Sequence, residues 1–274
     1  MDDPQLRELL DFFGLSWKGY RRVRKGVKKR ITRFMSQKEL PGMPELLSAL
    51  GADDSMQRQV ENLLNISISR FFRDRGLWQT LENSLLPAIL ARPTQEIKVW
   101  SGGCARGEEA YSVKILWERV TKNILHPPRL EVWASDMNPV FLNKAQAGIY
   151  SQSSLKEVPA EICKAYFYPV QGDDWAISAS IKEGIFWKVH HLLSDPPPWT
   201  GFEIIFLRNT LLTYYIQERQ VPALGRVISA LNRGGFLIIG SHEKLPRDFR
   251  GLEPAFHPSC IFQKVDRLEG KYEF

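Results

Sequence analysis

The chain has 274 residues, of which 43% are hydrophobic and 25% are charged, and its formal net charge is +6. These values are typical of a globular protein with one large domain or two modest ones. The sequence has no apolar run of the roughly 18 residues that a membrane helix needs, no secretory signal, and only three widely separated cysteines, so we expect a cytoplasmic protein without membrane insertion, disulfides or bound metal.

Residues 1–90 are predicted to be helical. Apolar residues recur every three or four positions over residues 6–13, and further helical patterns follow at 41–50 and 53–68. The stretch 18–33 contains nine Lys or Arg and no acidic residue. Because its apolar residues also recur at helical spacing, we expect an amphipathic helix with a cationic outer face.

From residue 91 onward, short apolar runs alternate with helical patterns. Four runs are expected to form strands: "EIKVWS", "RLEVWASD", "FEIIFLRN" and "GFLIIGSH". The alternation predicts an α/β fold with a doubly wound, mostly parallel sheet, to which residues 257–267 add an edge strand. Residues 166–190 have a different texture, with several short strands around a "GDD" turn, and are predicted to form a small β insertion.

The segment "VWSGGCARGEE", residues 99–109, marks the end of the first predicted strand. Ligands of open α/β sheets bind at the carboxyl ends of strands, and glycines such as Gly102 let the backbone approach a ligand closely. Glu108 and Glu109 would repel a phosphate, and the glycines do not follow the dinucleotide-binding pattern G-x-G-x-x-G. The turn therefore does not predict a pyrophosphate site.

Asp136 ends the second predicted strand in "ASDMNP". An acid at this position typically accepts hydrogen bonds from ribose hydroxyls. The ligand predicted in this way has a ribose, lacks a pyrophosphate and tolerates a positive charge, and S-adenosylmethionine fits this description because its sulfonium is cationic. The residues alone leave open a second interpretation, in which the turn only packs and Asp136 caps a helix.

Four segments resemble motifs of the chemotaxis-receptor glutamate methyltransferases, the CheR family. They occur in the family's order and are "SISRFFRD", "SGGCARGEEAYS", "ASDMNPVFLNKAQAGIY" and "IFLRNTLLTYY". The resemblance implies an all-helical N-terminal domain and linker (1–90) and a class I, Rossmann-like methyltransferase domain (91–274) with a small antiparallel β subdomain at about 166–190. It also implies methyl transfer from S-adenosylmethionine, leaving S-adenosylhomocysteine, to glutamate side chains in the cytoplasmic domains of methyl-accepting receptors.

The resemblance also implies which residues form the site. Arg73 and Tyr214 are expected beside the reacting groups, although the family's tyrosine aligns with Thr213, one residue earlier. The cofactor-binding residues implied by the motifs are Ser67, Ser69, Arg73, Gly102, Glu108, Asp136, Met137, His191, Leu192, Arg208 and Asn209, with His191 and Leu192 beside the adenine.

Methyl transfer to a glutamate needs little chemical machinery. The carboxylate is already ionised near neutral pH because its ordinary pKa is about 4.3, so it attacks the sulfonium methyl without a general base. Catalysis then depends on alignment and on removing water from the two ions. This is consistent with a sequence in which we find no catalytic triad.

Two other functions remain open at this point. One is a catalytically weak or inactive S-adenosylmethionine-binding signalling module, because Thr213 stands where the family has tyrosine. The other is a methyltransferase with a different acceptor, such as a small molecule or RNA. The basic stretch 18–33 suits acidic receptor helices, nucleic acid or solvent alone, but no RNA-reading motif is present. We therefore expect the protein to bind receptors and not nucleic acid. We also expect a monomer.

Overall fold

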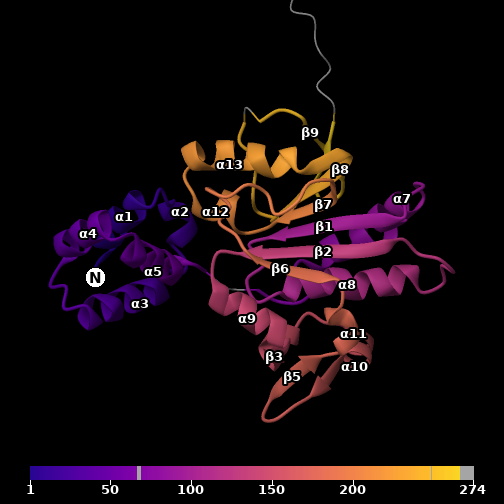
Figure 1. Ribbon diagram of the computed structural model, residues 1–274, viewed down its shortest axis with the longest axis horizontal. Coiled ribbons are helices and arrows are strands. Elements are labelled where there is room, and N and C mark those ends of the chain that lie inside the picture. Colours follow the sequence, from indigo (N-terminus) through magenta and orange to yellow (C-terminus); the bar gives the residue numbers. More distant parts are fainter. Residues whose placement is uncertain (67–68, 248, 266–274) are drawn as a thin grey trace, which may run out of the picture.

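The computed structural model describes residues 1–66, 69–247 and 249–265. These residues form two parts with separate hydrophobic cores, a group of N-terminal helices and a larger α/β part (Figure 1). In the described ranges, no helix is both long enough and apolar enough to cross a membrane.

The N-terminal part consists of five helices. The predicted basic helix is broken at residues 21–23, because its first turn packs against the α/β part while the remainder packs against the other N-terminal helices. The predicted apolar stripe is buried in both pieces, at Tyr20, Val27, Ile31 and Phe34. The five helices are α1 (Asp3–Phe12), α2 (Trp17–Tyr20), α3 (Arg24–Gln37), α4 (Met43–Ala52) and α5 (Asp54–Leu64).

Residues 69–90 connect the two parts and pack with the second one. Their buried side chains, including Phe71 and Trp78, belong to the hydrophobic core of the α/β part. Helical periodicity predicts which face of a segment is buried, but it does not predict which neighbour covers that face. The elements of this connection are α6 (Arg75–Thr80), the π-helical segment η1 (Leu81–Leu85) and α7 (Leu86–Leu90).

The α/β part is built on a seven-stranded sheet in the order β6-β2-β1-β7-β8-β10-β9. The first five strands pair in parallel and the last two antiparallel, which confirms the predicted mostly parallel sheet. The strands are β1 (Glu96–Gly102), β2 (Arg129–Asp136), β6 (Ile185–Val189), β7 (Phe202–Leu207), β8 (Leu231–Ile239), β9 (Leu252–Phe256) and β10 (Ile261–Lys264).

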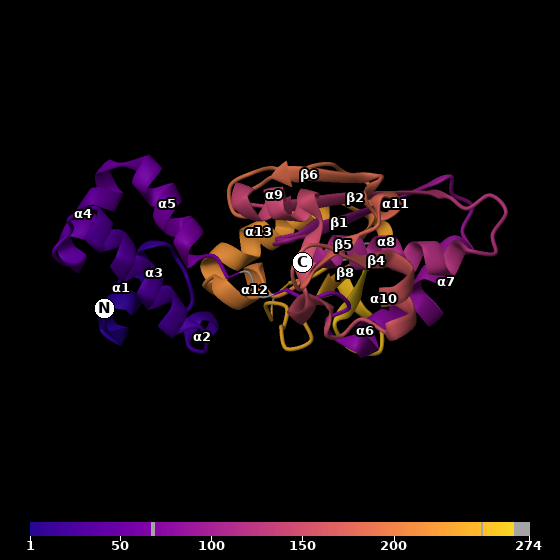
Figure 2. The same ribbon diagram turned by 90° about the horizontal axis from the view of Figure 1, so that it is seen from below.

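Helices cover both faces of this sheet, as a doubly wound arrangement requires. Figure 1 shows α13 (Gln217–Ser229) on one face and α8 (Glu108–Thr121) and α9 (Pro139–Ala147) on the other. The fully buried Trp100 and Phe206 lie on the central strands β1 and β7. The short helix α12 (Leu211–Tyr214) follows β7 and lies between the sheet and the N-terminal helices (Figure 2).

Two strand predictions differ from the structure. The segment 257–267 was expected at the edge of the sheet, but β10 lies between β8 and β9, and β9 forms the edge. Residues 185–189 were placed in the β insertion, but they form β6 and pair in parallel with β2. Strand pairing depends on long-range contacts, so the local pattern of a short apolar run does not identify its partner.

The small antiparallel sheet is inserted between α9 and β6 and has the strand order β3-β5-β4. It begins earlier in the chain than the predicted residue 166, because β3 comes directly after α9. Figure 1 shows this small sheet set apart from the large one. Its elements are β3 (Ile149–Ser151), the 3₁₀ turn η2 (Gln152–Leu155), α10 (Ala160–Tyr166), β4 (Phe167–Pro169), β5 (Asp174–Ile177) and α11 (Ala179–Lys182).

Candidate functional site

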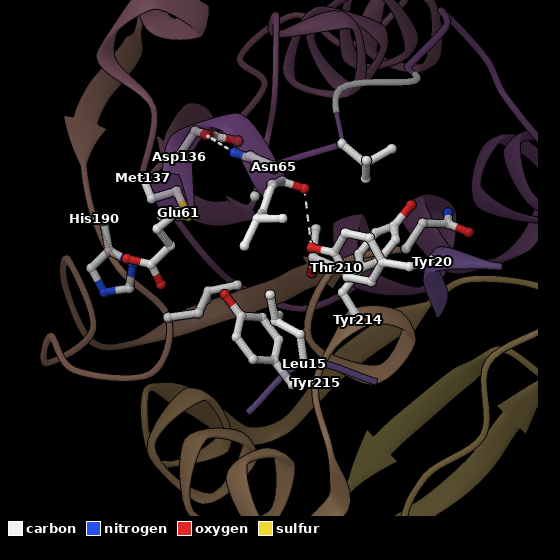
Figure 3. Close-up of a pocket in the computed structure, with 15 residues that line it drawn as sticks. Leu15, Tyr20, Glu61, Asn65, Asp136, Met137, His190, Thr210, Tyr214 and Tyr215 are labelled. Atoms are coloured by element: carbon white, nitrogen blue, oxygen red, sulfur yellow. Dashed lines mark hydrogen bonds between the residues drawn. The ribbon is translucent and has the colours of Figure 1, made fainter. Parts of the chain in front are cut away.

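A pocket that is partly open to solvent lies where the carboxyl ends of β1, β2, β6 and β7 meet the N-terminal helices (Figure 3). The α/β part contributes Gly103, Asp136, Met137, His190, Leu192, Asn209, Thr210, Tyr214 and Tyr215 to its lining, and the N-terminal part and linker contribute Leu15, Tyr20, Glu61, Leu64, Asn65 and Ile66.

The turn after β1 brings glycine backbone to the pocket. Gly103 has a positive φ of 75°, and a Cβ atom at this position would lie 2.3 Å from Cγ2 of Thr210. Only glycine fits here without displacing Thr210. The predicted residue Gly102 is next to the lining and packs against Leu192, where an added Cβ would lie 3.4 Å from the leucine Cδ2.

Asp136 is held in a fixed position at the end of β2. Its carboxylate accepts hydrogen bonds from the backbone N–H groups of Ala105 and Asn138, both at 2.9 Å, and from the side-chain amide of Asn65 at 3.3 Å. Burial raises the pKa of Asp136, and these hydrogen bonds oppose the rise. The N-cap of α9 is Asn138 rather than Asp136, so Asp136 is a preorganised acceptor at the pocket, with Met137 beside it.

The two histidines after β6 point to different places. His190 lines the pocket, and its Nε2 is 3.0 Å from the carbonyl oxygen of Pro196. The Nε2 of His191 is 2.9 Å from Glu61 on α5. Burial lowers the pKa of His191, but Glu61 and Asp195 raise it to a net value above the ordinary one.

Thus His191, which was predicted beside the adenine, ties the N-terminal part to the loop after β6. His190 and Leu192 line the pocket instead. The pair "HH" contains no sequence signal that distinguishes the two histidines, because the direction of each side chain depends on how the strand ends.

Arg208 is buried outside the pocket lining, whereas its neighbour Asn209 lines the pocket. The Arg208 guanidinium is 2.7 Å from Asp74 and 3.0 Å from Glu109, and it donates a hydrogen bond to the carbonyl of Arg73 at 2.9 Å. Burial lowers the pKa of Arg208, but the two carboxylates raise it to a net value above the ordinary one. Arg208 therefore holds the linker loop against the ends of β1 and β7.

The predicted acid Glu108 is 1% exposed, and burial raises its pKa. The Ser69 hydroxyl is hydrogen-bonded to the Glu108 carboxyl and opposes that rise in pKa, whereas Oε2 of Glu108 has no partner among the described residues. Glu109 accepts a hydrogen bond from Ser101 at 2.7 Å. The pocket lining includes neither glutamate. The predicted Ser67 lies outside the described residues.

Tyr214 lines the pocket at the side opposite Asp136 and packs edge-to-face on Tyr20, with 5.2 Å between ring centroids (Figure 3). Burial raises the pKa of Tyr214, the Arg73 charge opposes this rise, and the Glu243 charge adds to it. Arg73 is not among the described lining residues, and its carbonyl oxygen accepts hydrogen bonds from Arg208 at 2.9 Å and from the Trp78 indole at 2.8 Å. Thr213 points elsewhere, and its hydroxyl donates to Glu243 at 2.5 Å.

The lining residues fit a cationic nucleoside. They include two carboxylates, Glu61 and Asp136, and three tyrosine rings, but among the described lining residues there is no Lys or Arg. Carboxylates and aromatic faces attract cations, and the absence of basic side chains disfavours phosphates. Thr210 Oγ1 and His190 Nδ1 are buried without a hydrogen-bond partner in the described chain, so polar groups of a ligand can form hydrogen bonds with these two atoms.

Comparisons with known proteins identify the family of this chain. Residues 67–257 match the family model described as CheR methyltransferase, SAM binding domain. A chemotaxis protein methyltransferase of Listeria innocua is 30% identical over 225 residues, which cover 81% of this chain and 83% of that protein.

Two further proteins are similar to this chain. An uncharacterised 104.1 kDa protein of Rhodobacter capsulatus is 30% identical over 221 residues, but the match spans only 23% of its length. A TehB-like SAM-dependent methyltransferase of Corynebacterium glutamicum has 18% identity and a TM-score of 0.37, with 67% of this chain and 84% of that one covered. The family match over residues 67–257, together with the sheet topology and the pocket, leads to one assignment. The chain belongs to the CheR methyltransferase family, has the class I methyltransferase fold and uses S-adenosylmethionine as its cofactor.

Proposed function

We propose that this chain is a protein-glutamate O-methyltransferase that modifies glutamate side chains in the cytoplasmic part of chemotaxis-type receptors. The observation that carries the proposal is the family match over residues 67–257 together with a pocket whose lining, which includes Tyr214, suits a cationic methyl donor. The guanidinium of Arg73, which lies within the matched range, is a group that can dock a carboxylate. The names of the Listeria and Borreliella relatives, chemotaxis protein methyltransferase, support a receptor as the acceptor.

We assign the cofactor's ribose hydroxyls to Asp136, because its carboxylate is fixed by two backbone N–H groups and faces the pocket. The amide of Asn65, which makes the longer contact of 3.3 Å, is the partner that hydroxyls can replace. We assign the base to the neighbourhood of Met137, His190 and Leu192. These residues combine apolar surface with one unpartnered ring nitrogen.

The bound cofactor supplies an electrophilic methyl group on a positively charged sulfur. The chain's own residues have to hold the acceptor carboxylate in line with that group and exclude water. We assign docking of the carboxylate to Arg73 and its orientation to the Tyr214 hydroxyl. Alignment of this kind lowers a barrier by as much as roughly 7–11 kcal/mol. Because the acceptor carboxylate is already ionised near neutral pH, no proton transfer is required of Tyr214, whose raised pKa keeps its hydroxyl protonated.

The exposed surface of α3 is positively charged, which favours an acidic binding partner. Arg22 just before α3, and Lys25, Lys29 and Arg33 within it, are exposed, whereas Lys28 pairs with Asp3 on α1. A cationic surface of this kind attracts acidic helices over several ångströms and loses this attraction as salt is added. We therefore propose that α3 steers the glutamate-rich helices of a receptor toward the pocket, on the cytoplasmic side of the membrane.

The decisive test is transfer of a labelled methyl group from S-adenosylmethionine to a receptor cytoplasmic fragment from the same organism. We expect a base-labile product that disappears when the acceptor glutamates are replaced by alanine. Binding of S-adenosylhomocysteine without transfer to any such fragment would instead identify a non-catalytic signalling module. A base-stable product, or transfer to RNA with a matching gel shift, would identify a different acceptor.

A further inference from the structure

Glu243, in the loop after β8, has both carboxylate oxygens engaged by the segment that leads from β7 into α12. Oε1 accepts the Thr213 hydroxyl hydrogen bond at 2.5 Å. Oε2 accepts hydrogen bonds from the backbone N–H groups of Asn209 at 2.9 Å and Gly240 at 2.6 Å. One side chain thus joins the carboxyl ends of two neighbouring strands.

The segment held by Glu243 has an unusual backbone. Asn209 has a φ of +53°, a left-handed conformation that side chains other than glycine seldom adopt. The same residue and the next one, Thr210, line the cofactor pocket. A Cβ at position 240 would lie 2.8 Å from the Glu243 carboxylate and 3.0 Å from Asn209 Oδ1, so the glycine there leaves room for the carboxylate.

The opposite side of α12 is fixed by the N-terminal part. A Cβ at Gly19 on α2 would lie 2.3 Å from the Thr213 carbonyl oxygen and 3.1 Å from Cδ1 of Tyr214. The backbone N–H of Ser16 donates to the Tyr214 carbonyl at 2.7 Å. Helix α12 is therefore held between α2 on one side and Glu243 on the other, with the Tyr214 ring directed at the pocket.

We propose that Glu243 is a positioning residue for methyl transfer: by binding Thr213 and the strained Asn209 turn, it orients Tyr214 toward the pocket. The part of this proposal that is measured through kcat rests on the proposed function. Glu243 does not itself line the cofactor pocket; it contacts the pocket through the backbone N–H of Asn209, and it does not touch the acceptor in this scheme. Its effect is expected on the orientation of α12 and therefore on kcat, while the β1 and β2 ends that hold the cofactor remain unchanged.

The test compares Thr213→Val with Thr213→Ser. Valine has nearly the shape of threonine and removes only the hydroxyl that reaches Glu243, whereas serine keeps the hydroxyl. We expect kcat of Thr213→Val to fall on the order of 10- to 100-fold, the range that small misplacements near a reacting centre produce. The Kd of S-adenosylhomocysteine by calorimetry should stay at the wild-type value, and Thr213→Ser should retain most of the turnover.

Glu243→Ala provides the second arm. Alanine removes both acceptor oxygens, so kcat should fall, and adding Thr213→Val to Glu243→Ala should lower kcat little further. Crystal structures of Thr213→Val and Thr213→Ser give a readout that is independent of turnover. The Tyr214 ring should leave Tyr20 in the valine variant and remain in the serine variant.

Three results would overturn the positioning role: wild-type kcat in Thr213→Val, a parallel loss of S-adenosylhomocysteine affinity, or an unmoved Tyr214 ring. Failure of the proposed function is recognised separately, because wild-type protein would then fail to methylate any receptor fragment. In that case the comparison of crystal structures still decides whether Glu243 and Thr213 orient Tyr214.

Discussion

Replacing Asp136 with asparagine tests the cofactor assignment with little change in shape. The carboxylate accepts two backbone hydrogen bonds at 2.9 Å and an amide contact at 3.3 Å. Asparagine offers one oxygen and one NH₂ group, so one backbone donor, at Ala105 or Asn138, loses its acceptor. An unsatisfied buried group of this kind costs about 1–3 kcal/mol of folding stability.

The loss of the charge also affects the ligand. A hydrogen bond from a ribose hydroxyl to a charged acceptor contributes about 1.5–3 kcal/mol, which corresponds to roughly a 10- to 150-fold change in Kd. We therefore expect Asp136→Asn to bind S-adenosylhomocysteine about that much more weakly in calorimetry. The ligand should also raise the unfolding temperature of the variant less than that of the wild type.

Asp174→Asn is a suitable control, because Asp174 is an exposed aspartate on β5 of the small sheet. This variant loses the same charge and should bind the ligand as the wild type does. If Asp136→Asn is folded and binds S-adenosylhomocysteine with unchanged affinity, the ribose is not held by this carboxylate, and the placement of the nucleoside in the pocket is wrong.

Three other perturbations have expected outcomes. The pKa of His191 is raised in the folded state, so its pair with Glu61 stabilises the fold fully below about pH 6.5 and loses this effect as the pH rises through the higher folded-state pKa. The difference in unfolding free energy between the wild type and His191→Gln should therefore shrink as the pH rises over this range. A difference that stays constant with pH would contradict the pairing. Gly103→Ala should weaken S-adenosylhomocysteine binding and cost roughly 1 kcal/mol or more of stability, because its Cβ meets Thr210 at 2.3 Å at a positive φ; wild-type affinity and stability would contradict this. Lys29→Glu should raise the KM for a receptor fragment, most strongly at low salt, without changing the Kd of S-adenosylhomocysteine, and an unchanged KM would remove α3 from acceptor recognition.

The sequence predicts the central sheet well, because each of its buried parallel strands is a short apolar run followed by turn residues. Asp136 could be assigned from its position at a strand end, and the structure places it at the pocket. β9 was not predicted, since "LEPAF" contains a proline and has no continuous apolar run. The assignment of 185–189 to the insertion was wrong, because β6 pairs with β2 through contacts far apart in sequence.

Side-chain direction is the part of the site that the sequence does not predict. Neighbouring residues at the end of a strand or in a short helix point to different sides, and tertiary packing decides which of them reaches the pocket. For this reason His190 lines the pocket where His191 was expected. Arg208, whose motif suggested a ligand contact, instead neutralises Asp74 and Glu109 behind the site.

The same reasoning applies to the tyrosine that the family places at position 213. Judged from the alignment alone, Thr213 looks like the loss of an active-site residue. In the structure, the side chain at 213 is directed at Glu243, whereas the next ring, Tyr214, lines the pocket. The threonine alone is therefore no evidence of an inactive protein, because a tyrosine still lines the pocket at the next position.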